Sequence, residues 1–118
     1  MAEYPQPLAD ALVAAAWEAS FSIANARKAV DRVDLAYVAG CLFRAVGVLA
    51  HAIHGRDHRW LLNEKGAVAA TDRLPSSPAG FASKVAASIG AIAATERDLT
   101  TACDRLERLS SEVLAILT

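Results

Sequence analysis

The alternation of apolar and polar positions between Asp34 and His54 predicts the helix around which the chain is organised. Residues seven apart lie almost on one line along a helix, because seven steps of about 100° fall only ~20° short of two turns. With this spacing two neighbouring columns are apolar throughout: Leu35, Val38, Leu42, Ala45, Leu49 and Ala52, and beside them Ala36, Ala39, Phe43, Val46, Ala50 and Ile53. We predict a helix over 34–54, with Asp34 as its N-cap and Gly55 as the left-handed residue that ends it.

A third column of the same helix differs, and it contains Tyr37, Gly40, Arg44, Gly47, His51 and His54. A glycine inside a helix costs about 1 kcal/mol relative to alanine. Two of them in one column indicate that another helix, a partner chain or a ligand approaches closely there. The simpler interpretation is that this column faces water and that its glycines are tolerated for packing.

Apolar residues at spacings of three and four predict four further helices, over 8–31, 58–71, 81–94 and 96–117. In the first of these, Trp17, Phe21 and Ala24 are expected to widen the apolar face. Glu18, Ser22 and Asn25 share another face, where they could line a polar pocket or be solvated, and we favour solvation. The expected fold is an all-α, up-and-down four-helix bundle with 58–71 as an extra short helix, in one domain over 1–118.

Composition and charge narrow the possible functions. Hydrophobic residues make up 54% of the chain and charged residues 21%, with a surplus of alanine that favours helix. The net charge of −1 gives no overall field that would attract nucleic acid. Cys41 and Cys103 both lie in apolar helical patterns, which favours a reducing, cytoplasmic location.

The stretch from Leu35 to Ile53 is long enough to span a membrane. Arg44 near its centre would be costly in lipid, and the other predicted helices are amphipathic. We therefore expect the buried central helix of a soluble bundle and no membrane partner.

Arg44 and His51, with Tyr37 nearby, are the residues with catalytic potential. An arginine can hold a phosphate while a histidine moves a proton, which is what metal-free cleavage of RNA requires. His51, His54 and His58 have spacings that a metal site could use, but a helix ending at Gly55 would separate them, and we predict no metal site.

Arg44, six intervening residues and His51 on a long helix resemble the Arg and His motif of the HEPN superfamily. More specifically, residues 36–69, AYVAGCLFRAVGVLAHAIHGRDHRWLLNEKGAVA, resemble the helical C-terminal domain that follows the catalytic domain in a group of bacterial nucleotidyltransferases. The resemblance extends from the YPQPL segment at Tyr4 through RLPSSPAGF at residues 73–81, and therefore covers nearly the whole chain.

The resemblance implies a bundle that docks on a nucleotidyltransferase catalytic domain, in cis or in trans, and forms part of the pocket for a small-molecule acceptor. The Gly-Ser turn and paired aspartates that hold magnesium in that fold are missing from this sequence. Mg²⁺ and a nucleoside triphosphate would thus bind the catalytic domain, and we expect no cofactor on this one.

We therefore expect a non-catalytic, substrate-binding function. The expected contacts are Tyr37, Arg44, His51, Asn63, Glu64 and Lys65. Of these, Arg44 and Lys65 would meet anionic groups and Glu64 an amine or hydroxyl. The alternative is an enzyme, a metal-independent HEPN-type ribonuclease that acts as a dimer through Arg44 and His51, with RNA as its substrate. HEPN ribonucleases usually have a polar residue directly after the arginine, where this chain has Ala45, and this favours binding. A third possibility is a structural role, with the Gly40 and Gly47 face as a homodimer surface.

Overall fold

The chain is all-α, as predicted. The computed structural model describes residues 3–118, and no β-strand occurs within that range. In this described part of the chain six helices follow one another: α1 Gln6–Ala14, α2 Trp17–Arg27, α3 Leu35–Arg56, α4 Ala67–Asp72, α5 Phe81–Ile89 and α6 Glu96–Leu117.

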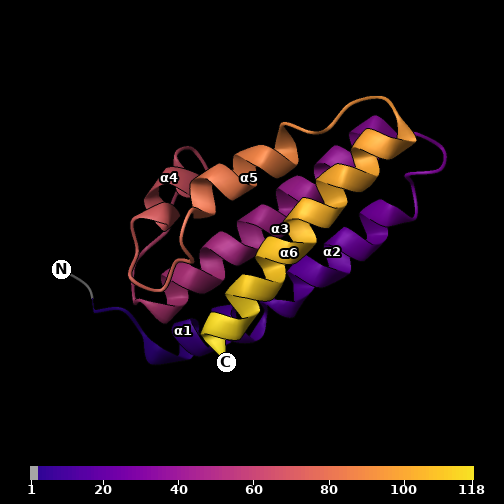
Figure 1. Cartoon of the computed structure of the whole chain (residues 1–118). Coiled ribbons are helices and arrows are strands. Elements are labelled where there is room, and N and C mark those ends of the chain that lie inside the picture. The colour runs from indigo at the N-terminus through magenta and orange to yellow at the C-terminus, as the bar shows by residue number, and fades with distance from the viewer. Residues whose placement is uncertain (1–2) are drawn as a thin grey trace.

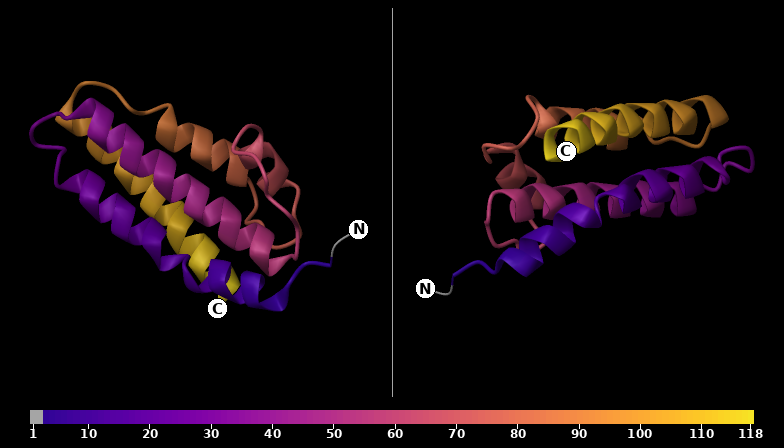
Figure 2. Two further views of the ribbon diagram at one scale, coloured as in Figure 1. Left: turned by 180° about the vertical axis from the view of Figure 1, so that it is seen from behind. Right: turned by 90° about the horizontal axis from the view of Figure 1, so that it is seen from below.

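The helices form two layers along one long axis (Figures 1 and 2). One layer contains α1, α2 and α3, and the other contains α5 and α6, with the short α4 between them at one end. The chain passes along the axis four times, since α3 returns beside α2, α5 runs back, and α6 returns beside α5. Helix α3 contacts all five other helices and is therefore the centre of the packing.

The first apolar column of α3 forms the core, as predicted. Val38, Leu42, Ala45, Leu49 and Ala52 are fully buried, together with large side chains of the other helices such as Ile23, Phe81 and Leu106. Only Leu35, at the start of the column, is partly outside the core, with 40% of its surface exposed. Asp34 caps the helix as expected, because its carboxylate accepts a hydrogen bond of 3.2 Å from the backbone N–H of Tyr37.

The second apolar column is buried only over its later half. Val46, Ala50 and Ile53 are buried, whereas Ala36 is exposed and Phe43 keeps 60% of its surface in solvent. An apolar column is therefore not buried along its whole length, and Phe43 is exposed although its column is apolar throughout.

The predicted helix over 8–31 is two helices. At Ala15 and Ala16 the α-helical hydrogen-bond pattern is interrupted by hydrogen bonds between residues three apart. One of them runs from the Ala16 N–H to the carbonyl of Val13, at 3.1 Å. No glycine or proline lies in the break. The break therefore reflects tertiary packing: it lets α1 lie against the far end of α3 while α2 follows the first part of α3.

Gly55 does not end α3, contrary to the prediction. The helix continues to Arg56, and the left-handed residue is His58, with φ of 54°. Gly55 is buried against α1, where an added Cβ would lie 3.0 Å from the Cβ of Leu12. Glycine is needed at this position because α1 approaches α3 closely.

The predicted helix over 58–71 was wrong from His58 to Gly66, which form a loop, and only α4 is helical. The loop is held by distant groups. Both oxygens of Asp57 accept hydrogen bonds from Ser76, at 2.9 Å from its backbone N–H and 2.5 Å from its hydroxyl. The ring of Tyr4 lies 4.7 Å from the ring of Trp60, centre to centre. These contacts hold residues 57–60 away from a helical path.

Helix α4 is tied to α3 by a buried histidine. The Nδ1 of His54 lies 2.8 Å from the carbonyl oxygen of Ala50 and 3.3 Å from the hydroxyl of Thr71. A carbonyl can only accept, so Nδ1 carries the proton. The hydroxyl of Thr71 donates to the carbonyl of Ala67 at 2.8 Å and so accepts from His54. His54 is only 3% exposed and is a core residue, not part of the polar column.

The last two helices match the prediction in place, although α5 ends earlier. It stops at Ile89 instead of 94, because Gly90 follows. Helix α6 spans the predicted range and is capped by the Thr95 hydroxyl, which accepts from the Asp98 backbone N–H at 3.0 Å. On the outside, the guanidinium of Arg27 joins α2 to Asp104 and Glu107 of α6 at 2.8 and 2.7 Å.

Helix α3 is long and apolar enough to cross a membrane by length and composition, a test that the core helix of a soluble protein also passes. Its buried face is covered by the other helices. The expectation of no membrane partner stays a prediction.

Gly47 and Gly55 give a matched test of this packing. Nothing lies within 4 Å of a Cβ added at Gly47, so Gly47→Ala should raise the free energy of unfolding by about 0.5–1 kcal/mol through helix propensity. At Gly55 the same change crowds Leu12, and overpacking typically costs about 1–3 kcal/mol. Gly55→Ala should therefore be less stable than the parent chain. Urea unfolding of both variants measures the difference, and equal stabilisation would contradict the packing described here.

Candidate functional site

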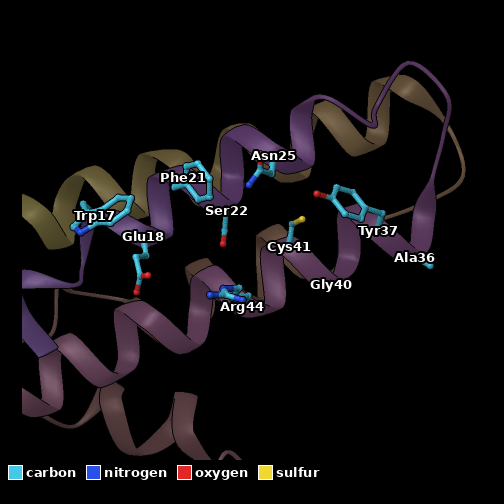
Figure 3. A pocket seen from close by; sticks show the side chains of 10 residues that line it. All are labelled: Trp17, Glu18, Phe21, Ser22, Asn25, Ala36, Tyr37, Gly40, Cys41 and Arg44. Carbon is cyan, nitrogen blue, oxygen red and sulfur yellow. The ribbon is translucent and has the colours of Figure 1, made fainter.

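A groove runs between α2 and α3 and is lined from both helices (Figure 3). We call it the α2–α3 groove. Its volume is about 480 Å³, and its lining residues are Trp17, Glu18, Phe21, Ser22 and Asn25 of α2 and Ala36, Tyr37, Gly40, Cys41 and Arg44 of α3. A Cβ added at Gly40 would meet nothing within 4 Å. The small residues of α3 thus keep the groove open.

The aromatic residues of α2 border this groove instead of widening the core. Trp17 is 59% exposed and Phe21 57% exposed, and their rings meet edge to face with centres 6.0 Å apart. The prediction of an apolar face widened by Trp17, Phe21 and Ala24 was wrong. Positions two apart on a helix point about 200° apart, so Phe21 cannot share the face of the buried Ile23. Helical angles alone could have found this.

The polar residues of α2 line the groove too. For Glu18, Ser22 and Asn25 we favoured simple solvation over a pocket, and the structure places all three in the groove wall. Their spacing of three and four put them on one face. The sequence could not show that α3 would leave space opposite that face.

Tyr37 stands at one end of the α2–α3 groove with its hydroxyl directed toward Cys41 (Figure 3). A hydrogen bond with the Cys41 side chain is the main cause that raises the pKa of Tyr37. The phenol therefore keeps its proton at neutral pH.

A second groove lies on the other side of α3, toward the 57–66 loop and α4, and we call it the α3–α4 groove. Its volume is about 370 Å³, and most of its lining is apolar. The polar side chains in the wall are Arg44, His51 and Glu64. Gly47 lies between Arg44 and His51 in the same wall, with open space above it. This groove therefore combines a cation, a titratable imidazole and a carboxylate around an apolar cleft.

The six residues predicted to bind substrate fall into three groups. Arg44, His51 and Glu64 share the α3–α4 groove, while Tyr37 shares only the α2–α3 groove with Arg44. Asn63 and Lys65 line neither groove. They shape the loop instead, because the Asn63 side chain accepts a 2.9 Å hydrogen bond from the Lys65 backbone N–H. The predicted helix over 58–71 would have placed Asn63 and Lys65 on helix faces. Because this segment is a loop, the two side chains do not join Arg44, His51 and Glu64 in the groove wall.

The polar groups of the two grooves are free to meet a ligand. Within residues 3–118 the ion pairs join Arg27 to α6, Lys84 to Glu112 and Arg97 to Asp98, and they involve neither Arg44 nor the acidic groups of the grooves. No helix of the described chain covers Gly40 or Gly47. Among the described residues no other helix is the close neighbour that the glycine column suggested, and a partner chain, a ligand or simple contact with water stay predictions.

The histidines do not gather. His54 is buried and hydrogen-bonded, His51 borders the α3–α4 groove, and His58 lies beyond the end of α3 with its ring stacked on Tyr4 at 5.4 Å. In the part of the chain that the structure describes, no three His, Cys, Asp or Glu side chains form a group that could hold a metal ion. That the protein binds no metal remains a prediction.

Comparison of the chain with protein-family models, curated proteins and solved structures gives no match. The case for a function therefore depends on the geometry described above and on the resemblance of residues 36–69.

The two cysteines should differ in reactivity. Cys103 is fully buried, and this burial raises the pKa of its thiol, so it is rarely ionised near neutral pH. Cys41 is partly exposed in the α2–α3 groove. Iodoacetamide at pH 8 should alkylate Cys41 in the native protein and Cys103 only after unfolding. Peptide mass mapping over time checks this, and equal rates at both thiols would show that the groove or the core is not as described.

Proposed function

We propose that this chain is the non-catalytic, substrate-binding domain of a nucleotidyltransferase, an up-and-down four-helix bundle of HEPN-like type. In this proposal the α3–α4 groove contributes to the acceptor pocket, beside a catalytic domain in cis or in trans that supplies Mg²⁺ and the nucleoside triphosphate. The observation that carries it is the convergence of Arg44, His51 and Glu64, none of them in an ion pair among the described residues, on one apolar groove. Few polar groups in a mostly apolar concavity are typical of ligand sites.

Each polar group has a separate role in this proposal. The guanidinium of Arg44 pairs with an anionic group of the acceptor, and two parallel hydrogen bonds give that contact its direction. The carboxylate of Glu64 accepts from an amine or hydroxyl. His51 lies in the wall of the groove, and its two ring nitrogens can donate to or accept from the acceptor molecule.

Two of the expected contacts, Asn63 and Lys65, lie in the loop that also carries Glu64. We assign them no direct contact with the acceptor in the isolated chain. In the proposed complex this loop, which borders the α3–α4 groove, contacts the catalytic domain. Tyr37 belongs to the neighbouring groove and has no role in this site.

Glucosamine 6-phosphate is a suitable probe, because it carries an ammonium group, hydroxyls and a phosphate. A ligand at 100 times its Kd stabilises a protein by about 2.7 kcal/mol, which raises the Tm of a domain of this size by several degrees. We expect such a rise, weaker with glucose 6-phosphate or glucosamine, which each lack one charge. Glu64→Gln and Arg44→Ala should abolish it, while Arg108→Ala, on the exposed face of α6, should not. No rise with the parent chain, or an equal rise in all variants, would contradict the proposed site.

A direct test of the larger identity is the reading frame that adjoins this coding sequence in its genome. A Gly-Ser turn followed by two closely spaced aspartates would place the catalytic half beside the domain.

The alternative is a metal-independent ribonuclease, which is favoured by one observation: Arg44 and His51 lie in the wall of the same groove. Under this alternative the purified chain cleaves single-stranded RNA in the presence of EDTA, and His51→Ala reduces the rate by about 100-fold or more, as expected for loss of a general acid or base. The substitution His58→Ala, outside the groove, should leave the rate unchanged. Gel analysis of a labelled RNA measures this. If the parent chain leaves the RNA intact, the alternative is wrong and the binding function stands alone.

A further inference from the structure

The α2–α3 groove contains the hydroxyl of Ser22, a buried residue whose Oγ opens on the groove (Figure 3). Ser22 is only 5% exposed, and its Oγ forms no hydrogen bond with any residue from 3 to 118. Serines and threonines inside helices can donate to the carbonyl one turn earlier, as Thr71 and Thr101 do here. Figure 3 shows the Ser22 hydroxyl directed instead into the space between α2 and α3. A hydroxyl that no group of the described chain engages and that faces an open groove can hydrogen-bond a ligand there.

Two opposite charges lie near that hydroxyl. The Glu18 side chain extends from α2 toward α3, and the Arg44 side chain lies on α3 below Ser22 (Figure 3). Both line the groove, yet within the described residues neither forms an ion pair, with the other or elsewhere. A ligand that contains both an ammonium and an anionic group would satisfy the two together.

The rim of the groove at this end is aromatic. Trp17 and Phe21 hold more than half of their surface in solvent, in edge-to-face contact with each other. Exposed aromatic pairs of this size are good contacts for an apolar or aromatic ligand group. At the other end of the groove are neutral polar groups, those of Asn25 and Tyr37.

We propose that the α2–α3 groove binds a free α-amino acid with an aromatic or large apolar side chain. The ammonium pairs with Glu18, the carboxylate with Arg44 and the hydroxyl of Ser22, and the side chain lies against Trp17 and Phe21. The volume of about 480 Å³ is within the usual range for small-molecule sites. This inference does not depend on the proposed nucleotidyltransferase function, whose groove lies on the opposite side of Arg44 and does not include Glu18 or Ser22.

Cys41 supplies a local readout, because its side chain lines this groove and not the α3–α4 groove. The probe is L-phenylalanine at millimolar concentration, compared with phenethylamine, 3-phenylpropionate and glycine, which lack the carboxylate, the ammonium and the ring. We expect L-phenylalanine to raise the Tm and to slow alkylation of Cys41. The three analogues should bind about tenfold more weakly or worse, because each loses a charged hydrogen bond or the aromatic contact.

Three variants make the assignment specific. Glu18→Gln and Ser22→Ala should each weaken binding of L-phenylalanine while leaving folding intact, since neither side chain has a partner within the described chain. Glu96→Gln, at the exposed start of α6, removes the same charge elsewhere and should bind as the parent does. Glu64→Gln should also leave this binding unchanged, which separates the result from the test of the proposed function.

The proposal is overturned if L-phenylalanine neither shifts the Tm nor protects Cys41 in the parent chain. It is also overturned if phenethylamine or 3-phenylpropionate protects equally well, since the two charges would then have no joint role. Protection of Cys41 that grows with protein concentration in the absence of ligand, with a matching dimer in sedimentation, would overturn it in favour of an interface between two copies.

Discussion

The structure depends on one constraint, the burial of the apolar column of α3. Val38, Leu42, Ala45, Leu49 and Ala52 lose all contact with water, and to achieve this the chain must cover α3 with α1 and α2 in one layer and with α5 and α6 in the other. Burial of large aliphatic side chains contributes roughly 1.5–3 kcal/mol each, so this column and the residues against it dominate the stability of the fold. The column of α3 that contains Gly40, Arg44 and Gly47 is left with small and polar residues, and no described side chain lies within 4 Å of a Cβ added at either glycine.

Both grooves follow from that arrangement. Gly40 and Gly47 add no side chain to the surface of α3, and no neighbouring helix fills the space above them. Arg44 lies between the two glycines in sequence and borders both grooves. Because one guanidinium serves two concavities, an anion bound in one groove reduces the positive charge that the other can offer. The acidic partners are separate, with Glu18 on one side and Glu64 on the other. Substitutions of Glu18 and Glu64 can therefore distinguish the two proposed ligands, whereas a substitution of Arg44 would affect both.

The 57–66 loop shows how distant contacts determine a local structure. Asp57 is held by Ser76, Trp60 by Tyr4 near the N-terminus, and the helix that follows by the buried pair His54 and Thr71. Each partner is far away in sequence or across the fold. Together they turn a segment with helix-forming residues into an irregular wall of the α3–α4 groove, and in doing so place Glu64 opposite His51 and Arg44.

The sequence by itself determined the all-α class, the start of α3, the range of α6, the caps Asp34 and Thr95 and the buried column of α3. The caps follow from hydrogen bonds between residues close in sequence, and the helices and the buried column follow from the spacing of apolar residues at the helical repeat. It also singled out Arg44, His51 and Glu64. Only the tertiary structure decided that Gly55 is a contact with Leu12 and not a helix end, that His54 is a core residue, and that Asn63 and Lys65 shape a loop. It likewise decided that Glu18, Ser22 and Asn25 face a groove. The reason is physical: a helical pattern shows which residues share a face, but whether that face meets a neighbour, water or an open space depends on helices that are remote in sequence.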